Sequence, residues 1–308
     1  MQTIDALQGF VRRSFTYDGD GRLTKVSEHD GSELTITRNG SGAPTALVGR
    51  GGQTTTVTLD GNGYLSQLTA PGSVETNLVH TSTGLLTKLT RPDGGEHDFG
   101  YTPGGLLSTD TSPGRTQSLL RSVIPNGWQV VHDTGSGSTT TRRTELPDGS
   151  SQSTVVDEVG GETVTVVGLD GSITKTTPDG TQATSTYAPD PRFGMAAAFI
   201  ASNTIRRPSA RTSVLTRTRA VSTEPGNVAN AASMTDVVRV NDDLVSTLTW
   251  TGGATRTHVT ERAGGKRSTT TLDELGRTIS VQQSGGATPT TTTWNAEGRF
   301  GPASSTQI

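Results

Sequence analysis

One glycine recurs through the first third of the chain at a constant interval. Its spacing is 21 residues in five successive copies: Gly21, Gly42, Gly63, Gly84 and Gly105. A fixed period of this length is typical of proteins built from repeated units, in which each unit packs against its neighbours. The interval therefore limits the chain to a repeat architecture before any single motif is considered.

Three columns of residues around this glycine are apolar in nearly every copy. Six residues before it stand Phe15, Ile36, Val57, Leu78 and Phe99. Two residues after it stand Leu23, Pro44, Leu65, Leu86 and Leu107. Five residues after it stand Val26, Leu47, Leu68, Leu89 and Asp110. Side chains at one position of successive repeats can stack on neighbouring strands and bury surface that a lone repeat cannot, so we expect these columns to form the core.

A second set of turn signals falls halfway between the glycines. They are Asp30-Gly31, Gly51-Gly52, Pro71-Gly72, Asp93-Gly94 and Pro113-Gly114. Glycine tolerates the positive φ that tight hairpin turns need, and Asp and Pro favour turns as well. Each unit thus holds two strand-length stretches and two turns, which predicts one β-hairpin per repeat.

Composition argues for a thin sheet. Only 29% of the 308 residues are hydrophobic, well below the roughly 45–50% apolar share of ordinary globular domains even when the 39 glycines are allowed for. The middle strand positions are polar on both faces, as at Thr24 and Lys25. We therefore predict an all-β fold of antiparallel hairpins, with solvent outside and a wide cavity or a cargo inside.

The strict period ends near Gln117, but turn signals continue along the rest of the chain. We expect one continuous repeat region over residues 1–308, divided into five repeats (14–118), degenerate hairpins (119–186), an irregular insert (187–236) and degenerate repeats (237–308). The insert carries several prolines and arginines and the apolar run 195–201. We interpret it as irregular chain with one short helical or buried segment, followed by alternating strand from Thr212 to Val221.

Charge and cysteine content argue against several classes of protein. The net charge is −3 and the basic residues are dispersed among acids, so no nucleic-acid partner is expected. The absence of cysteine excludes disulfides and thiolate metal sites. The longest apolar run has seven residues, whereas a bilayer span takes about 20, and the first ten residues do not resemble a secretory signal.

Candidate metal and catalytic residues are few and scattered. Residues 18–21 begin like a calcium loop, but His29 stands where such a loop needs an acid, so we interpret them as a plain turn. No metal-ligand spacing relates the five histidines: His29, His80, His97, His132 and His258. No nucleophile-elbow pattern surrounds any serine. We therefore predict a non-catalytic chain that uses no cofactor or metal.

Two surface patterns offer alternative functions. The alternation Arg217-Thr218-Arg219 could contact an acidic partner, but we interpret it as the solvated face of a strand. Tyr17 and Tyr101 could stack on sugars, although Arg38, Leu59 and His80 interrupt their column. An adhesion or carbohydrate-binding module is the alternative hypothesis; an enzyme within the insert is a third, which lacks a convergent set of acid, base or metal ligands.

The stretch Tyr17-Asp18-Gly19-Asp20-Gly21-Arg22-Leu23 resembles the YD repeat, also called the RHS repeat. The core of that repeat is Tyr-Asp, two variable residues and Gly-Arg-Leu. Degenerate copies with the same internal spacing are Leu272-Asp273 with Gly276-Arg277, and Trp294-Asn295 with Gly298-Arg299. The resemblance is strong over residues 14–118 and 260–300 and weaker between them.

The resemblance implies hairpins laid down in one long spiralling sheet that closes into a hollow shell, as in insecticidal toxin complexes, polymorphic bacterial toxins and teneurin adhesion proteins. It implies an exported or cell-surface bacterial scaffold, whose partners are flanking repeats of the same polypeptide and an enclosed C-terminal toxin domain. Asp190-Pro191 is similar to the self-cleavage dipeptide of such shells, but repeats continue beyond it, so we assign it no such role. Both ends fall within a repeat, and we expect a section of a larger protein.

Overall fold

The computed structural model describes residues 2–4, 11–253, 256–273, 276–286 and 288–294. Within these ranges the chain consists of β-strands joined by turns, and each strand pairs antiparallel with the next one along the sequence. The predicted all-β fold of repeated antiparallel hairpins is confirmed. None of the described residues forms a helix that is long and apolar enough to cross a membrane.

The first eleven strands cover the region of the strict period. They are β1 (Gln2–Ile4), β2 (Val11–Tyr17), β3 (Leu23–Glu28), β4 (Glu33–Arg38), β5 (Pro44–Gly49), β6 (Thr54–Leu59), β7 (Leu65–Ala70), β8 (Val74–His80), β9 (Leu86–Thr90), β10 (Glu96–Tyr101) and β11 (Leu107–Ser112). Each repeat contributes two of these strands, so β2–β3, β4–β5 and their successors are the predicted hairpins.

Fifteen further strands continue the same sheet. They are β12 (Arg115–Ile124), β13 (Gly127–Asp133), β14 (Ser138–Glu145), β15 (Ser151–Val156), β16 (Glu162–Val167), β17 (Ile173–Thr176), β18 (Gln182–Asp190), β19 (Gly194–Arg206), β20 (Thr212–Glu224), β21 (Asn227–Val240), β22 (Asp243–Thr251), β23 (Arg256–Arg262), β24 (Arg267–Leu272), β25 (Thr278–Gln283) and β26 (Thr290–Thr291). The alternating strand predicted from Thr212 to Val221 is confirmed by β20.

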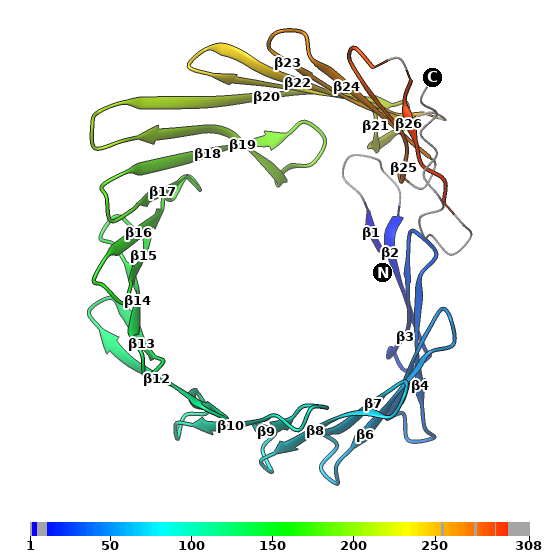
Figure 1. Ribbon diagram of the computed structural model, residues 1–308, viewed down its shortest axis with the longest axis vertical. Helices are drawn as coiled ribbons and strands as arrows, with labels where there is room; N and C mark the ends of the chain where they lie inside the picture. Colours follow the sequence, from blue (N-terminus) through cyan, green and yellow to red (C-terminus); the bar gives the residue numbers. More distant parts are fainter. Residues whose placement is uncertain (1, 5–10, 254–255, 274–275, 287, 295–308) are drawn as a thin grey trace.

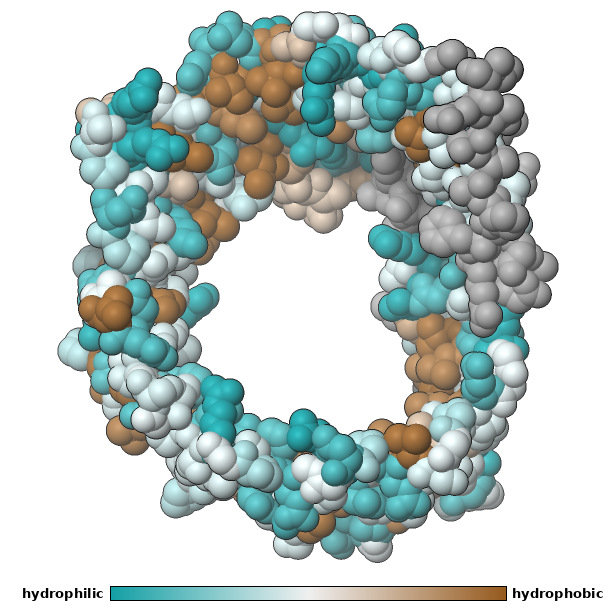
Figure 2. Space-filling view, in the orientation of Figure 1, coloured by the Kyte–Doolittle hydropathy of each residue, from teal (hydrophilic) through white to brown (hydrophobic). Residues whose placement is uncertain are grey.

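The single sheet of 26 strands curls around a central hollow. In Figure 1 the first strands and the last strands lie on the same side of the ring. Figure 2 shows in the same view that the hollow is open at its centre when side chains are drawn in full. A twisted sheet coils naturally as strands are added, and this coiling accounts for the ring.

The repeat glycines recur every 21 residues because each occupies the same position in a turn. Gly21 ends a three-residue turn in which the Asp18 amide donates to the Arg22 carbonyl at 2.9 Å. All five repeat glycines have φ between +76° and +90°, a region that residues with a Cβ avoid. The Asp18 carboxylate accepts from the amides of Asp20 and Arg22 at 3.0 and 2.8 Å, and these bonds lower its pKa. The Asp and Gly of the motif therefore build one turn together.

The apolar columns share one face of the sheet. Phe15 pairs with Val26 across β2–β3, and the equivalent pairing recurs in the next three repeats. Val26 then pairs with Leu34, which lies two residues from Ile36 on the same side of β4. These column residues remain partly exposed, because nothing is packed over a single-layered sheet.

The fully buried apolar residues of the described chain lie outside the strict repeats. They are Ala231, Trp250 and Leu272, with Val221 and Met234 packed against them. The expectation that the repeat columns would form the core is therefore corrected: the columns order the sheet, while the buried apolar residues among those described lie on β21, β22 and β24. That region is the part of the ring where a second layer of chain lies on the sheet.

Residues 187–236 differ from the irregular insert that we expected. They form the end of β18, all of β19 and β20 and most of β21, and the apolar run 195–201 is strand, not helix. β19 pairs with β20 only from Ser202 to Arg206. Beyond that point β18 and β19 pair only with each other, so their hairpin leaves the sheet, and bulges follow Thr186 and Ala188. Such bulges bend a strand out of plane.

Candidate functional site

The hairpin tip, which we define as residues 187–201, is the second layer. In Figure 1 it lies between β20 and the central hollow. It therefore covers the inner face of β20–β22, the face that carries Arg217, Arg219 and Asp236. Residues on a strand alternate between faces, so Arg217 and Arg219 project together, and Asp236 stands opposite Arg219 on β21.

Two arginines hold the Asp236 carboxylate. The Arg219 Nε donates to Asp236 Oδ1 at 2.8 Å and the Arg219 Nη2 donates to Oδ2 at 2.9 Å, a two-pronged geometry. The Arg217 Nε donates to the same Oδ2 at 3.0 Å, and the Arg217 Nη2 also contacts that oxygen. Asp236 is only 1% exposed, so these contacts take the place of its hydration.

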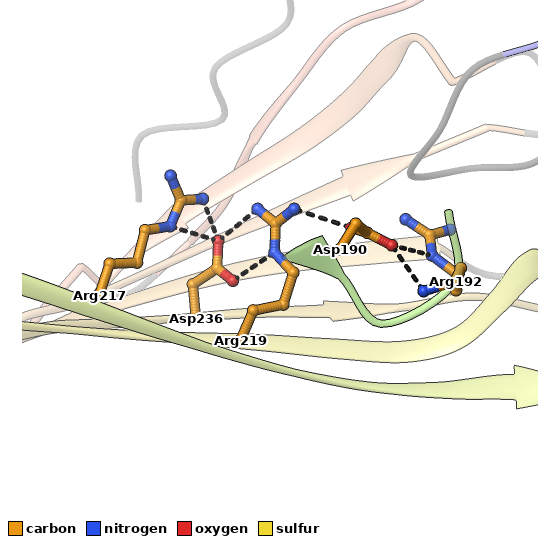
Figure 3. Close-up of polar contacts among 5 residues, drawn as sticks. All are labelled: Asp190, Arg192, Arg217, Arg219 and Asp236. Atoms are coloured by element: carbon orange, nitrogen blue, oxygen red, sulfur yellow. Dashed lines mark hydrogen bonds and ion pairs between the residues drawn. The ribbon is translucent and has the colours of Figure 1, made fainter. Parts of the chain in front are cut away.

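The hairpin tip joins the network through Asp190. The Arg219 Nη1 donates to Asp190 Oδ2 at 3.0 Å, so that Arg219 lies between the two carboxylates, as Figure 3 shows. The other oxygen of Asp190 accepts from the backbone amide and the Nε of Arg192, at 2.9 and 3.3 Å. The network therefore links the tip to the sheet through an ion pair between Arg219 and Asp190.

The contacts of the network shift the pKa values of three of its groups, Asp190, Arg219 and Asp236. Burial alone would raise the pKa of Asp236, but hydrogen bonds from Arg219 and Arg217 outweigh it and lower that pKa. Burial of Asp190 is likewise outweighed by bonds from Arg192 and Arg219, which lower its pKa. The bond to Asp236 raises the pKa of Arg219. Within the network, three guanidiniums contact two carboxylates.

Aromatic rings cover the flanks of the network. The Phe199 ring lies 4.7 Å from the Arg219 guanidinium carbon and 5.7 Å from that of Arg217. The Phe193 ring lies 4.8 Å from the guanidinium of Arg192. The cation–π contacts of Phe199 therefore join the tip to the two arginines of β20.

A cavity of about 310 Å³ adjoins these charges. The five residues of the network line it together with Met234, Leu248, Trp250 and His258. A neighbouring groove of about 470 Å³ is mostly apolar and is lined by Ile200, Ile205, Leu215, Val238 and Val240. Arg217 belongs to the wall of both, so the charged cavity and the apolar groove adjoin at that residue.

The interpretation of Arg217 and Arg219 as a solvated strand face is wrong. The Arg219 side chain is 13% exposed, and both arginines are paired with Asp236. Sequence reasoning also missed Asp190 and Asp236 as partners. The sequence does contain a signal: two arginines two residues apart on one strand, and an isolated aspartate on the next strand that can lie opposite them. Without the register of β20 against β21, that signal could not be told from chance.

The tyrosine column of the repeat motif joins neighbouring repeats. The Tyr101 hydroxyl donates to the Leu86 carbonyl at 2.6 Å, and in the same column Arg38 donates to the Leu23 carbonyl at 3.0 Å. The Trp294 Nε1 donates to the Thr278 carbonyl at 2.9 Å in the same manner. In each case the acceptor lies two residues after the preceding repeat glycine. These side chains are therefore engaged in the sheet and do not form an aromatic platform.

The histidines and acids of the described chain show no metal-binding arrangement. His97 contacts Asp110 at 2.9 Å and His132 contacts Gln117 at 2.8 Å, each as an isolated pair. No three His, Cys, Asp or Glu side chains converge within the ranges that the structure describes. The inner cavity is thus the best-built candidate site, and its chemistry is that of charge and hydrogen bonding.

Comparison with known proteins agrees with the fold. A family model described as the teneurin YD-shell matches residues 1–304. The chain is similar to a crystal structure of TcdB2-TccC3-Cdc42, with a TM-score of 0.52 and 12% identity, over 95% of this chain and 19% of that one. It also matches a crystal structure of TcdB2-TccC3-TEV with a TM-score of 0.37 and 11% identity, over 94% of this chain and 18% of that one. No curated protein matches. The first likeness shows the fold alone, and this chain spans about a fifth of the length of that structure.

Proposed function

Because the chain belongs to the teneurin YD-shell family, we propose that it forms one section of a shell that encloses another polypeptide. The chain is a structural shell scaffold of the YD/RHS type. The observation that carries the proposal is the continuous sheet of 26 strands, which curls around an open hollow instead of a packed interior. A wall one strand thick encloses volume with little material, because the strands pair their backbone groups along the sheet.

The proposed cargo is a toxin domain of the same polypeptide, and the proposed setting is outside the producing cell. Support comes from the resemblance of the repeats to those of bacterial toxin-complex shells. The proposal includes a non-catalytic role, because the family is of the scaffold type.

The lack of cysteine in the sequence allows a direct test, because any introduced thiol is unique. Ser246 and Thr247 are neighbours on β22: Ser246 shares the inner face with Leu248, which stands opposite Asp236, whereas Thr247 points outward. Variants Ser246→Cys and Thr247→Cys should be made in the complete polypeptide in which this chain occurs, with any cysteine outside these 308 residues replaced by serine. Each is then treated with a small maleimide and with a maleimide carrying a bulky polymer.

We expect the small reagent to label both variants, and the bulky reagent to label Thr247→Cys at least tenfold faster than Ser246→Cys. Denatured samples provide the control, since both thiols should then react alike. Equal labelling of the native variants by the bulky reagent would show that the inner face is open, and would overturn the proposal of enclosure.

A further inference from the structure

We propose that Asn39 is a site of spontaneous deamidation, at which the backbone nitrogen of Gly40 attacks the Asn39 carboxamide carbon and expels ammonia. The site lies in the turn 39–43, between β4 and β5. The proposal is independent of the proposed function, because it concerns the chemistry of one turn and not what the shell encloses. It identifies a position at which the wall changes covalently after synthesis.

The chain contains three Asn-Gly dipeptides: Asn39-Gly40, Asn62-Gly63 and Asn126-Gly127. Asparagine is a thermolabile residue, and glycine, which has no Cβ, hinders an attacking backbone nitrogen less than any other residue does. The three dipeptides are identical in sequence, so a difference in their reactivity depends on the structure around each of them.

The first argument is the freedom of the attacking nitrogen. The Gly40 amide has no hydrogen-bond partner among the described residues, and a Cβ at Gly40 would meet nothing within 4 Å. The Gly63 amide, in contrast, donates to the Asp60 carbonyl at 3.0 Å. The amide proton has to leave when the nitrogen attacks, so a hydrogen bond that holds this proton slows the reaction at Asn62.

The third dipeptide is held by the sheet on both sides of its peptide bond. The Asn126 carbonyl accepts from the Glu145 amide at 2.9 Å, and Gly127 begins β13, which pairs with both β12 and β14. Closing a ring onto this peptide group would break these pairings. Among the three dipeptides, only Asn39-Gly40 therefore has an attacking nitrogen that can react without loss of a hydrogen bond.

The second argument is the surroundings of the Asn39 carboxamide oxygen. This Oδ1 accepts from the amides of Ser41 and Ala43, at 3.1 and 3.0 Å, and from the Ser41 hydroxyl at 2.7 Å. Attack on the carboxamide carbon places negative charge on this same oxygen. Donors that already point at developing charge stabilise the intermediate, as in an oxyanion hole. Within the described chain, no donor contacts the carboxamide oxygen of Asn62.

The reaction balances with water as its only co-reactant. The Gly40 nitrogen gives its proton to water and forms a bond to Asn39 Cγ, after which the carboxamide C–N bond breaks and ammonia leaves with a proton from water. A second water molecule then opens the cyclic imide at either carbonyl. Opening at the side-chain carbonyl gives aspartate, whereas opening at the main-chain carbonyl gives isoaspartate, in which the main chain runs through the former side chain.

The turn can accommodate the aspartate product. Asp18 and Asp60 occupy the equivalent position of the neighbouring repeats, and Asp18 caps its turn with the same pair of amide bonds. Arg38 donates to the Gly42 carbonyl at 3.0 Å, so the new negative charge arises beside a guanidinium. Deamidation to aspartate therefore leaves a capped hairpin with one additional charge.

The test incubates the full 308-residue chain in neutral buffer at physiological temperature and follows each asparagine by proteolytic digestion and mass spectrometry. In the folded chain we expect Asn39 to deamidate roughly tenfold faster, or more, than Asn62 and Asn126. In concentrated urea the three should react at similar rates, because only the dipeptide that they share then determines the rate.

Matched variants test the two arguments. Gly40→Ala hinders the attacking nitrogen and should slow the deamidation of Asn39 by roughly tenfold or more. Gly61→Ala, at the equivalent position of the next turn and with equal space around it, is the control and should leave that rate unchanged. Ser41→Ala removes one donor to the Asn39 oxygen and should slow the reaction several-fold. Circular dichroism establishes that each variant is folded, and Ser41→Ala decides the matter if Gly40→Ala does not fold.

Equal rates at the three asparagines of the folded chain would overturn the proposal, as would a rate at Asn39 that neither Gly40→Ala nor Ser41→Ala lowers. Asn39→Asp reproduces the aspartate product and should unfold in urea at the midpoint of the wild type or above it. A lower midpoint would contradict the inference that the turn accommodates this product.

Discussion

At the scale of single residues, Arg219 does most to hold the second layer on the sheet. It reaches Asp190, 29 residues before it, and Asp236, 17 residues after it, through three different nitrogens. Both carboxylates are at most 2% exposed, so water cannot replace the guanidinium as their hydrogen-bond partner when Arg219 is lost. Buried charges that lose their partner are among the most destabilising changes known in proteins.

Replacing Arg219 by Met should therefore lower the free energy of unfolding by about 3–5 kcal/mol. Urea titration followed by tryptophan fluorescence measures the change, since Trp250 lies in the adjoining core. Arg239→Met, on the exposed outer face of β21, is the control and should cost about 0.5 kcal/mol or less.

A triple variant that adds Asp190→Asn and Asp236→Asn to Arg219→Met should lower the free energy of unfolding further, because Arg192 and Arg217 then lose these carboxylates as partners. A cost for Arg219→Met no larger than that of Arg239→Met would show that the network does not hold the tip.

At the scale of elements, the hairpin turn is the unit that repeats. Asp60 caps the third repeat's turn through the amides of Asn62 and Tyr64, at 2.9 Å each. Gly63 then takes φ of +85°, which lets β7 leave in the right direction to pair with β6. The same cap recurs in the degenerate repeat at Asp273, whose carboxylate accepts a hydrogen bond from the Arg277 amide at 2.9 Å.

Two glycines of one turn allow the effect of backbone φ to be distinguished from the effect of steric crowding. A Cβ at Gly61 or at Gly63 would meet nothing within 4 Å, but only Gly63 has positive φ. Gly63→Ala should destabilise the chain by about 1–2 kcal/mol because of backbone strain. Gly61→Ala should be neutral or stabilising by a few tenths of a kcal/mol. Equal unfolding midpoints in urea for the two variants would contradict the role of φ.

At the scale of the whole molecule, every strand takes its stability from the strands beside it. Each described strand pairs with its neighbours in sequence, and no pairing joins β26 back to β1 within the described ranges. Among the described residues, β1 and β26 each have a partner strand on one side only, and open edges recruit further strands. In a longer shell, flanking repeats would supply those strands.

The chain expressed by itself should accordingly associate as its concentration rises, and sedimentation velocity measures this directly. Thr3→Lys combined with Thr290→Lys charges both edges and should shift the distribution toward monomer. A wild-type chain that stays monomeric at all concentrations and melts cooperatively would contradict the inference that its strand edges pair with other chains.

Much of the fold follows from local chemistry. The interval of 21 residues, the paired turn signals and the polar strands predict repeated hairpins, because each of these features acts within a few residues of its own position. A residue such as Gly63 needs no distant partner for its φ to be decided. The resemblance to YD repeats rests on the same turn, whose Asp and Gly cooperate over four residues.

The candidate site follows from long-range geometry. Arg219 and Asp236 meet because β20 and β21 pair in one register among many, and Asp190 joins them because bulges bend β18 away from the sheet. Outside residues 187–211, the sequence by itself determined the strands, the turns and the absence of a thick core, all of which depend on neighbouring residues. Only the tertiary structure decided that one hairpin folds inward and buries a charged network, since that outcome depends on contacts between segments tens of residues apart.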